Sequence, residues 1–124
     1  GTVTARKRRC GWFDAVLVRQ TIKISGINAI ALTKLDVLDS FDTIKVCHSY
    51  KVDGLDTPFK SRLLHKVEPV YENFKGWKDS LNNCQDFNNL PEETKTFISY
   101  IEDYVDVKVT LISNGPNRSD LIHR

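Results

Sequence analysis

The chain has 124 residues, of which 40% are hydrophobic and 27% charged, and its formal net charge is +2. This length predicts one domain with a single core, and so small a net charge gives no reason to expect a nucleic-acid partner. No apolar run approaches the roughly 20 residues of a membrane-spanning helix, so no membrane partner is expected either. The widely spaced Cys10, Cys47 and Cys84 lack CxxC pairing and predict free thiols in a reducing cytoplasm.

The first segment, GTVTARKRRCG, joins small hydroxylated residues to the basic run Arg6–Arg9. Backbone N–H groups and hydroxyls suit carboxylates and phosphates, and arginine can hold an oxyanion through two hydrogen bonds. Basic runs also occur in solvated tails and nucleic-acid patches, but the adjoining GTVT and Gly11-Trp12 favour an ordered loop. The chain has no methionine and begins inside this motif-like segment, so we expect a piece of a longer protein.

A helix is predicted from Asp14, which can cap it, to about Ser25, with Gly26 available for a left-handed C-cap. Trp12, just before it, is expected to be a packing anchor. The apolar spacing predicts that the helix buries one face, made of Phe13, Val16, Leu17, Thr21 and Ile24 and widened by Val18 and Ile22.

The apolar, partly β-branched stretch Ile27–Leu32 predicts a buried strand, and the polar turn Thr33-Lys34-Leu35-Asp36 follows it. Open α/β sheets bind ligands at this end of their strands. A carboxylate at Asp36 can accept two hydrogen bonds at once, which matches the adjacent N–H and NH2 donors of guanine, and the stem of Lys34 can lie along a flat base. Taken alone, these four residues are explained more simply by a solvated turn.

Residues 43–52, TIKVCHSYKV, alternate in polarity and predict a strand that ends at the Asp53-Gly54 turn. One face of this strand is expected to carry Ile44, Val46, His48 and Tyr50. The pattern weakens between residues 55 and 90, so we expect an irregular excursion with one short extended segment near Val67–Tyr71.

Pro91-Glu92-Glu93 predicts the start of a second helix, which should end near Asp106. Residues 107–113, VKVTLIS, then predict a core strand that opens into the loop Ser113–Arg118. Backbone N–H groups of such a loop can bind a carbonyl or phosphate oxygen, although a plain turn is the commoner outcome. The buried stripe of the helix is expected to contain Thr94, Phe97, Ile98, Ile101 and Val105.

Together these elements predict an α/β fold in which two strands end in polar loops at one edge of a sheet, with the basic loop facing the same cleft. This is the geometry of a nucleotide site. The chain has no GxxxxGK[ST] phosphate loop, no Ser-His-Asp or Cys-His arrangement and no metal-ligand spacing. We therefore predict no catalytic residue and no metal ligand within it.

Four motifs, in this order along the chain, resemble the adenylosuccinate synthetase family. GTVTARKRRCGWFD is similar to its GTTTGR-x-RR-x-GW-x-D segment and LTKLDVLD to its guanine loop; YENFKGW resembles YE-x-x-PGW, and LISNGPNR resembles IS-x-GP-x-R. The similarity covers essentially all of residues 1–124. It implies the carboxyl-terminal portion of the enzyme, part of a nucleotide-binding α/β sheet with flanking helices.

That family ligates IMP and L-aspartate with GTP and Mg2+ in purine (AMP) biosynthesis, as a cytoplasmic homodimer. The resemblance implies that Arg6 bridges the IMP ribose and the aspartate carboxylate, and that Arg8 reaches the GTP side. The implied aspartate and IMP loop consists of Thr2, Val3, Thr4, Ala5, Arg6, Lys7 and Arg8. The implied GTP site consists of Arg8, Lys34, Leu35, Asp36, Ser113, Asn114 and Gly115.

Val3 and Ala5 depart from the family pattern, which has threonine and glycine there. Val3 lacks a hydroxyl that could bind aspartate, and Ala5 restricts a position that glycine would leave free. The phosphate loop, the catalytic aspartate and histidine and the Mg2+ ligands of the family lie upstream of Gly1. We therefore expect this chain alone to have no ligase activity and to bind GTP weakly at best.

Two other hypotheses stay open. One is a basic nucleic-acid-binding module that uses Arg6–Arg9, against which stand the low net charge and the lack of aromatic residues interleaved with the basic run. The other is a non-catalytic fragment that serves only dimerisation or folding.

Overall fold

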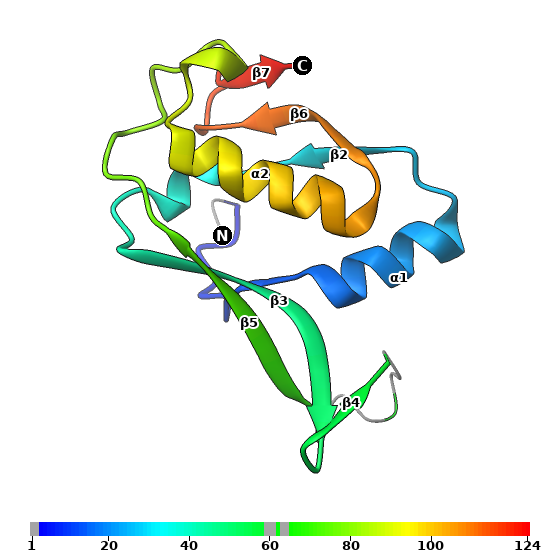
Figure 1. Cartoon of the computed structure of the whole chain (residues 1–124). Coiled ribbons are helices and arrows are strands. Elements are labelled where there is room, and N and C mark those ends of the chain that lie inside the picture. Colours follow the sequence, from blue (N-terminus) through cyan, green and yellow to red (C-terminus); the bar gives the residue numbers. More distant parts are fainter. Residues whose placement is uncertain (1–2, 59–61, 63–64) are drawn as a thin grey trace.

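The computed structural model, which describes residues 3–58, 62 and 65–124, is a mixed α/β structure (Figure 1). The predicted fold class is therefore confirmed. One sheet contains β1 (Phe13–Asp14), β3 (Thr43–Val52), β4 (Leu55–Thr57) and β5 (Glu68–Lys75). The other contains β2 (Ala29–Leu32), β6 (Lys108–Ser113) and β7 (Leu121–His123). The helices are α1 (Ala15–Ser25) and α2 (Glu92–Val105), with short 3-10 helices η1 (Leu35–Leu38) and η3 (Phe87–Asn89).

Strand β3 organises the first sheet, pairing in parallel with β1 and antiparallel with β4 and β5. In the second sheet β6 is central, parallel to β2 and antiparallel to β7. Helix α2 packs against β5 and β6, which belong to different sheets, and α1 packs against both α2 and β3 (Figure 1). The main hydrophobic core thus lies around α2. Its fully buried members include Ile44, Trp77, Leu81, Ile98, Ile101, Ile112 and Ile122.

Helix α1 has the predicted caps but not the predicted buried face. The Asp14 carboxylate accepts a hydrogen bond from Leu17 N (3.1 Å), and Gly26 adopts the left-handed φ of 65°. Ala15, Val16 and Ile22 are buried, whereas Thr21 is exposed and the side chains of Leu17 and Ile24 are 38% and 75% exposed. The buried face is rotated because α1 packs on α2 through its Arg19 side, where the guanidinium lies 4.3 Å from the centre of the Tyr104 ring.

Helix α2 begins and ends where its capping residues predict. All five residues of the predicted stripe are buried, and Glu102, which the apolar pattern did not include, is buried with them. Within the described part of the chain, neither helix combines the length and the apolar character needed to cross a bilayer.

Two predictions about strands are corrected. Strand β2 is not buried on both faces: Ala29 and Ala31 are exposed, whereas Ile30 and Leu32, on the opposite face, are half-buried and pack against the core. In β3 the pairing register shifts between Cys47 and Ser49, which interrupts the alternation, so Cys47 is buried while His48 is only half-buried.

The excursion between residues 55 and 90 is also more regular than predicted. Strand β5 extends to Lys75 and pairs with β3 from Lys51 to Thr43. Most of its side chains are exposed, and Pro69 lies within it, as is tolerated in an edge strand. The sequence of β5 shows neither an apolar face nor a regular alternation of polar and apolar residues, so it gave little sign of a strand of this length.

Candidate functional site

The two predicted binding loops leave the second sheet at the same edge. Strands β2 and β6 are parallel neighbours, with Leu32 opposite Ile112, so residues 33–36 and 113–115 both follow the carboxyl ends of adjacent strands. Helix η1, which begins inside the first loop, also contacts β6. The structure therefore brings Lys34, Leu35 and Asp36 together with the loop that contains Ser113, Asn114 and Gly115.

In the first loop, the backbone turns at Lys34, which has φ 59° and ψ 36°. This left-handed conformation costs a non-glycine residue about 1 kcal/mol. Leu35 offsets it by burying its side chain in the core, where it is 2% exposed. Lys34 is exposed and Asp36 half-buried. The Asp36 carboxylate has no hydrogen bond or ion pair to the described residues, so both of its oxygens can accept from a ligand.

The second loop is held by contacts within the fold. Asn114 is fully buried, and its Nδ2 donates to Leu81 O and to Cys84 O (2.8 Å), while its backbone N–H donates to Asp120 O (3.1 Å). Gly115 lies so close to Asp120 that a Cβ there would be 2.4 Å from Asp120 Oδ2. The amide nitrogen of Asn114 is thus committed to the fold, and its Oδ1 is buried without a hydrogen-bond partner among the described residues. The loop backbone and Ser113, whose Oγ donates to Gly115 O (3.2 Å), remain to face a ligand.

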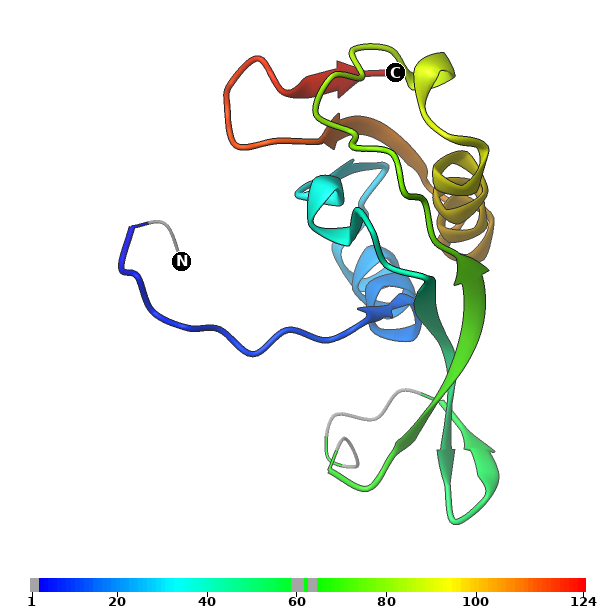
Figure 2. The same cartoon turned by 90° about the vertical axis from the view of Figure 1, so that its left-hand side faces the viewer.

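The basic segment forms an exposed arm. Figure 2 shows that the arm extends away from the rest of the fold, on the same side as the turn between β6 and β7. Ala5 has φ 51°, a left-handed conformation that glycine adopts without strain. Thr2 lies outside the described residues. The other predicted contact residues are all exposed: Val3, Thr4, Ala5, Arg6, Lys7 and Arg8. Thr4 and residues 6–9 line an open concavity.

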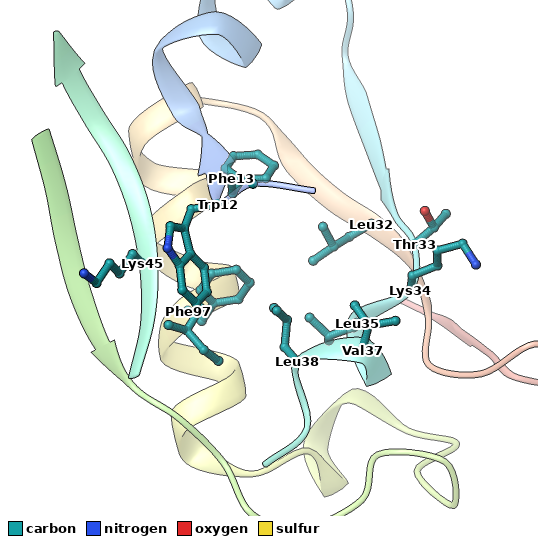
Figure 3. Close-up of a pocket in the computed structure, with 12 residues that line it drawn as sticks. Trp12, Phe13, Leu32, Thr33, Lys34, Leu35, Val37, Leu38, Lys45 and Phe97 are labelled. Atoms are coloured by element: carbon teal, nitrogen blue, oxygen red, sulfur yellow. The ribbon is translucent and has the colours of Figure 1, made fainter. Parts of the chain in front are cut away.

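A cavity of about 200 Å³ lies beside the first loop. Leu32, Leu35 and Leu38 point into it, with Trp12 and Phe13 on the opposite wall, whereas the amine of Lys34 points away from it (Figure 3). Its lining is mainly apolar and offers little that could hydrogen-bond a base, so it is a packing space behind the loop. Trp12 is the packing anchor that was predicted, half-buried and edge-on to Phe41 at 5.6 Å between ring centres.

The titratable group with the largest resolved pKa shift, Tyr50, lies away from this edge. Tyr50 donates a hydrogen bond to Asp14, and burial together with this carboxylate raises the pKa of the phenol. Burial, assisted by Asp14, also raises the pKa of the Cys47 thiol, which keeps it protonated and unreactive. Among the residues that the structure describes, no three His, Cys, Asp or Glu side chains gather as metal ligands would.

Sequence reasoning did not pair two residues that support the first loop, Asp39 and Trp77. Asp39, the second aspartate of LTKLDVLD, accepts a hydrogen bond from Trp77 Nε1 (2.8 Å), 38 residues away. Both residues lie in motifs that the sequence singled out, but nothing local indicated that they are partners.

Comparisons with known proteins agree with this arrangement. The sequence model of the adenylosuccinate synthetase family matches residues 1–122. The chain also superimposes on a fully ligated adenylosuccinate synthetase from Plasmodium falciparum with a TM-score of 0.92 and 38% sequence identity. That match covers all of this chain and 31% of the Plasmodium chain, so this chain spans about a third of its relative. The chain belongs to the adenylosuccinate synthetase family.

Proposed function

We propose that this chain supplies the guanine pocket and the aspartate loop of a GTP-dependent ligase that joins IMP and L-aspartate into adenylosuccinate. The observation that supports this most is the pairing of β2 with β6, which sets the Asp36 loop beside the Gly115 loop at one sheet edge. There the two Asp36 carboxylate oxygens accept no hydrogen bond from the described residues, and guanine offers two adjacent donors on its Watson–Crick edge. Adenine lacks these donors, so the site would select GTP.

Within this proposal, each loop has a distinct role. Asp36 accepts from the guanine N1–H and 2-amino group, Lys34 covers the face of the base, and Leu35 anchors the loop through the core. Ser113 and Gly115 donate toward the guanine O6, while Asn114 fixes their backbone. In the arm, Arg6 holds the IMP ribose and the aspartate carboxylate and Arg8 the GTP side, since the arginine N–H groups can donate to ribose hydroxyls as well as to carboxylate and phosphate oxygens.

The remaining features of the family are proposals as well. Mg2+ would neutralise charge on the GTP phosphates, but the described residues form no ligand cluster for it, so we place its ligands outside this chain. The chain alone is accordingly proposed to be inactive; adenylosuccinate formation by the isolated chain would contradict this. We also propose a homodimer, and a cytoplasmic location that suits the free thiols of Cys10, Cys47 and Cys84.

Asp36→Asn tests the guanine pocket in the full-length enzyme. The substitution replaces one acceptor by an amide donor that faces the guanine 2-amino group, so we expect the Kd for GTP to rise about 30-fold. The same amide can donate to the 2-oxo group of xanthine, so binding of xanthosine triphosphate should improve. Equilibrium binding measurements with GTP and with xanthosine triphosphate give the two Kd values and show whether the preference is exchanged.

Asp103→Asn is the matched control, because Asp103 is an exposed aspartate on α2 and should leave both Kd values unchanged. Unchanged GTP binding in Asp36→Asn would contradict the guanine pocket. Salt-sensitive polynucleotide binding that depends on Arg6–Arg9 would instead favour the nucleic-acid hypothesis.

A further inference from the structure

The segment Gly76–Cys84 touches both loops of the proposed guanine site. On the side of the first loop, it engages Asp39, which directly follows η1. Asp39 Oδ1 accepts from Trp77 Nε1 (2.8 Å), and Asp39 Oδ2 accepts from Leu81 N (3.1 Å). The backbone N–H of Ser40 also donates to Trp77 O (3.1 Å). Both oxygens of this carboxylate are therefore used to hold the end of η1 against the segment.

On the side of the second loop, the same segment engages Asn114. Its amide donates to Leu81 O and Cys84 O, so Leu81 binds Asp39 through its N–H and Asn114 through its carbonyl. One peptide segment thus joins the loop that carries Asp36 to the loop that carries Gly115. The two loops are 77 residues apart in the sequence (113 − 36), and this link supplements the pairing of β2 with β6.

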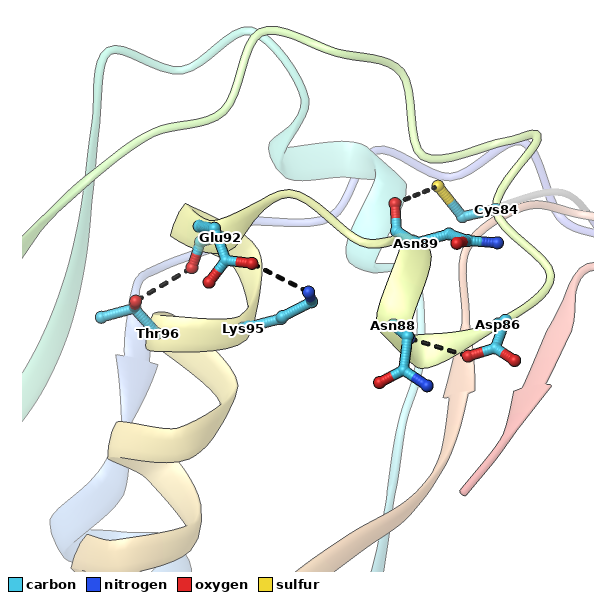
Figure 4. Close-up of polar contacts among 7 residues, drawn as sticks. All are labelled: Cys84, Asp86, Asn88, Asn89, Glu92, Lys95 and Thr96. Atoms are coloured by element: carbon cyan, nitrogen blue, oxygen red, sulfur yellow. Dashed lines mark hydrogen bonds and ion pairs between the residues drawn. The ribbon is translucent and has the colours of Figure 1, made fainter.

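The link is buried and fixed at its far end. Trp77, Leu81 and Asn114 are 2%, 0% and 0% exposed. Hydrogen bonds in such surroundings are stronger than in water, and water cannot replace a lost partner easily. At the end of the segment, the Cys84 thiol donates to Asn89 O (3.7 Å) and so ties the segment to η3, which Asp86 caps by accepting a hydrogen bond from Asn88 N (2.8 Å) (Figure 4).

We propose that Asp39 and Asn114 are positioning residues of the guanine site, which set the separation of its two loops through the segment Gly76–Cys84. This inference rests on the proposed function. Asp39 lies one 3-10 turn after Asp36, and its N–H donates to Asp36 O (3.1 Å), so releasing the Asp39 side chain lets the Asp36 carboxylate shift. Guanine must contact Asp36 through its N1–H and 2-amino group and the backbone of residues 113–115 through its O6. A small displacement of either loop therefore weakens both contacts.

Asp39→Asn in the full-length enzyme tests this role. An amide of nearly the same size offers one acceptor where two N–H donors point, so one of the two part-buried hydrogen bonds is lost. We expect the Kd for GTP to rise about five- to tenfold and the Kd for IMP to stay within about twofold. A purely structural role would lower the unfolding temperature without separating these two ligands.

Asp42→Asn is the matched control. Asp42 lies three residues further on, and its exposed carboxylate pairs with Lys78 of the same segment, which lowers the pKa of Asp42. Both side chains are solvent-exposed, so this ion pair contributes little to holding the segment. The same chemical change there should leave the GTP affinity unaltered. Trp77→Phe is a second variant that keeps an aromatic ring in the core but removes the N–H that Asp39 accepts, and it should weaken GTP binding in the same selective way.

The outcomes separate the two levels of the proposal. If Asp36→Asn weakens GTP binding while Asp39→Asn and Trp77→Phe leave it within about twofold of wild type, the positioning role is wrong and the guanine pocket stands. If Asp36→Asn has no effect either, the pocket is misplaced and the positioning role falls with it. Equal weakening of GTP and IMP by Asp39→Asn would also overturn the positioning role.

Discussion

Gly76→Ala is expected to destabilise the protein by about 3 kcal/mol or more, which is a large effect for the addition of one methyl group. A Cβ at this position would lie 1.7 Å from Phe41 O and 2.7 Å from Phe41 C. Both are backbone atoms, so no side-chain rotation can make room. The backbone is also fixed by the hydrogen bond from Gly76 N to Asp42 O (2.9 Å). Urea unfolding of the protein measures the loss as a lower midpoint.

Gly11→Ala is the control for this substitution. A Cβ at Gly11 would meet nothing within 4 Å, and its φ is not in the left-handed region. We expect the free energy of unfolding to change by no more than about 0.5 kcal/mol, because only the unfolded chain loses freedom. If both variants unfolded at the same urea concentration as wild type, the close approach of residues 41 and 76 would be refuted.

The sequence predicted best those elements whose ends carry their own chemical signals. Asp14 and Gly26 bound α1, Pro91 begins α2, and the alternation of residues 43–52 coincides with β3. These signals act within a few residues, so they need no knowledge of the rest of the fold. The two loops that we propose to bind guanine were predicted for the same reason, since each directly follows an apolar run.

Features that depend on distant partners were not predictable in this way. Strands β1, β4 and β7 are two or three residues long and exist because β3 or β6 lies beside them. The buried side of α1 depends on where α2 packs. Likewise, the local pattern marked Asp36 as a ligand group but could not show that Asp39 binds residues 77 and 81.

Glu102→Ala is expected to cost about 3 kcal/mol of unfolding free energy, because Glu102 is a buried charge with two partners. The residue is 4% exposed; Oε2 accepts from Val109 N (2.8 Å) and Oε1 from Arg124 Nη1 (2.7 Å). The substitution would leave the Val109 N–H without its acceptor in the core. Arg124 would lose its counter-ion, although its guanidinium, 3.8 Å from the centre of the Phe87 ring, keeps a cation–π contact.

A double-mutant cycle with Arg124→Ala distinguishes this ion pair from simple loss of packing. Arg124→Ala alone leaves the buried Glu102 carboxylate with the Val109 N–H as its remaining partner, whereas the double variant leaves no buried charge. We therefore expect the double variant to be less destabilised than the sum of the single variants by more than about 1 kcal/mol. The pair Lys95–Glu92, 2.9 Å apart on the same helix, with Glu92 exposed and Lys95 half-buried, is the matched control and should show a coupling of less than about 0.5 kcal/mol. Additive losses at Glu102 and Arg124 would mean that the carboxylate acts only through Val109 N. In that case Glu102 would hold the start of β6, while Arg124 would contribute its contact with Phe87 alone.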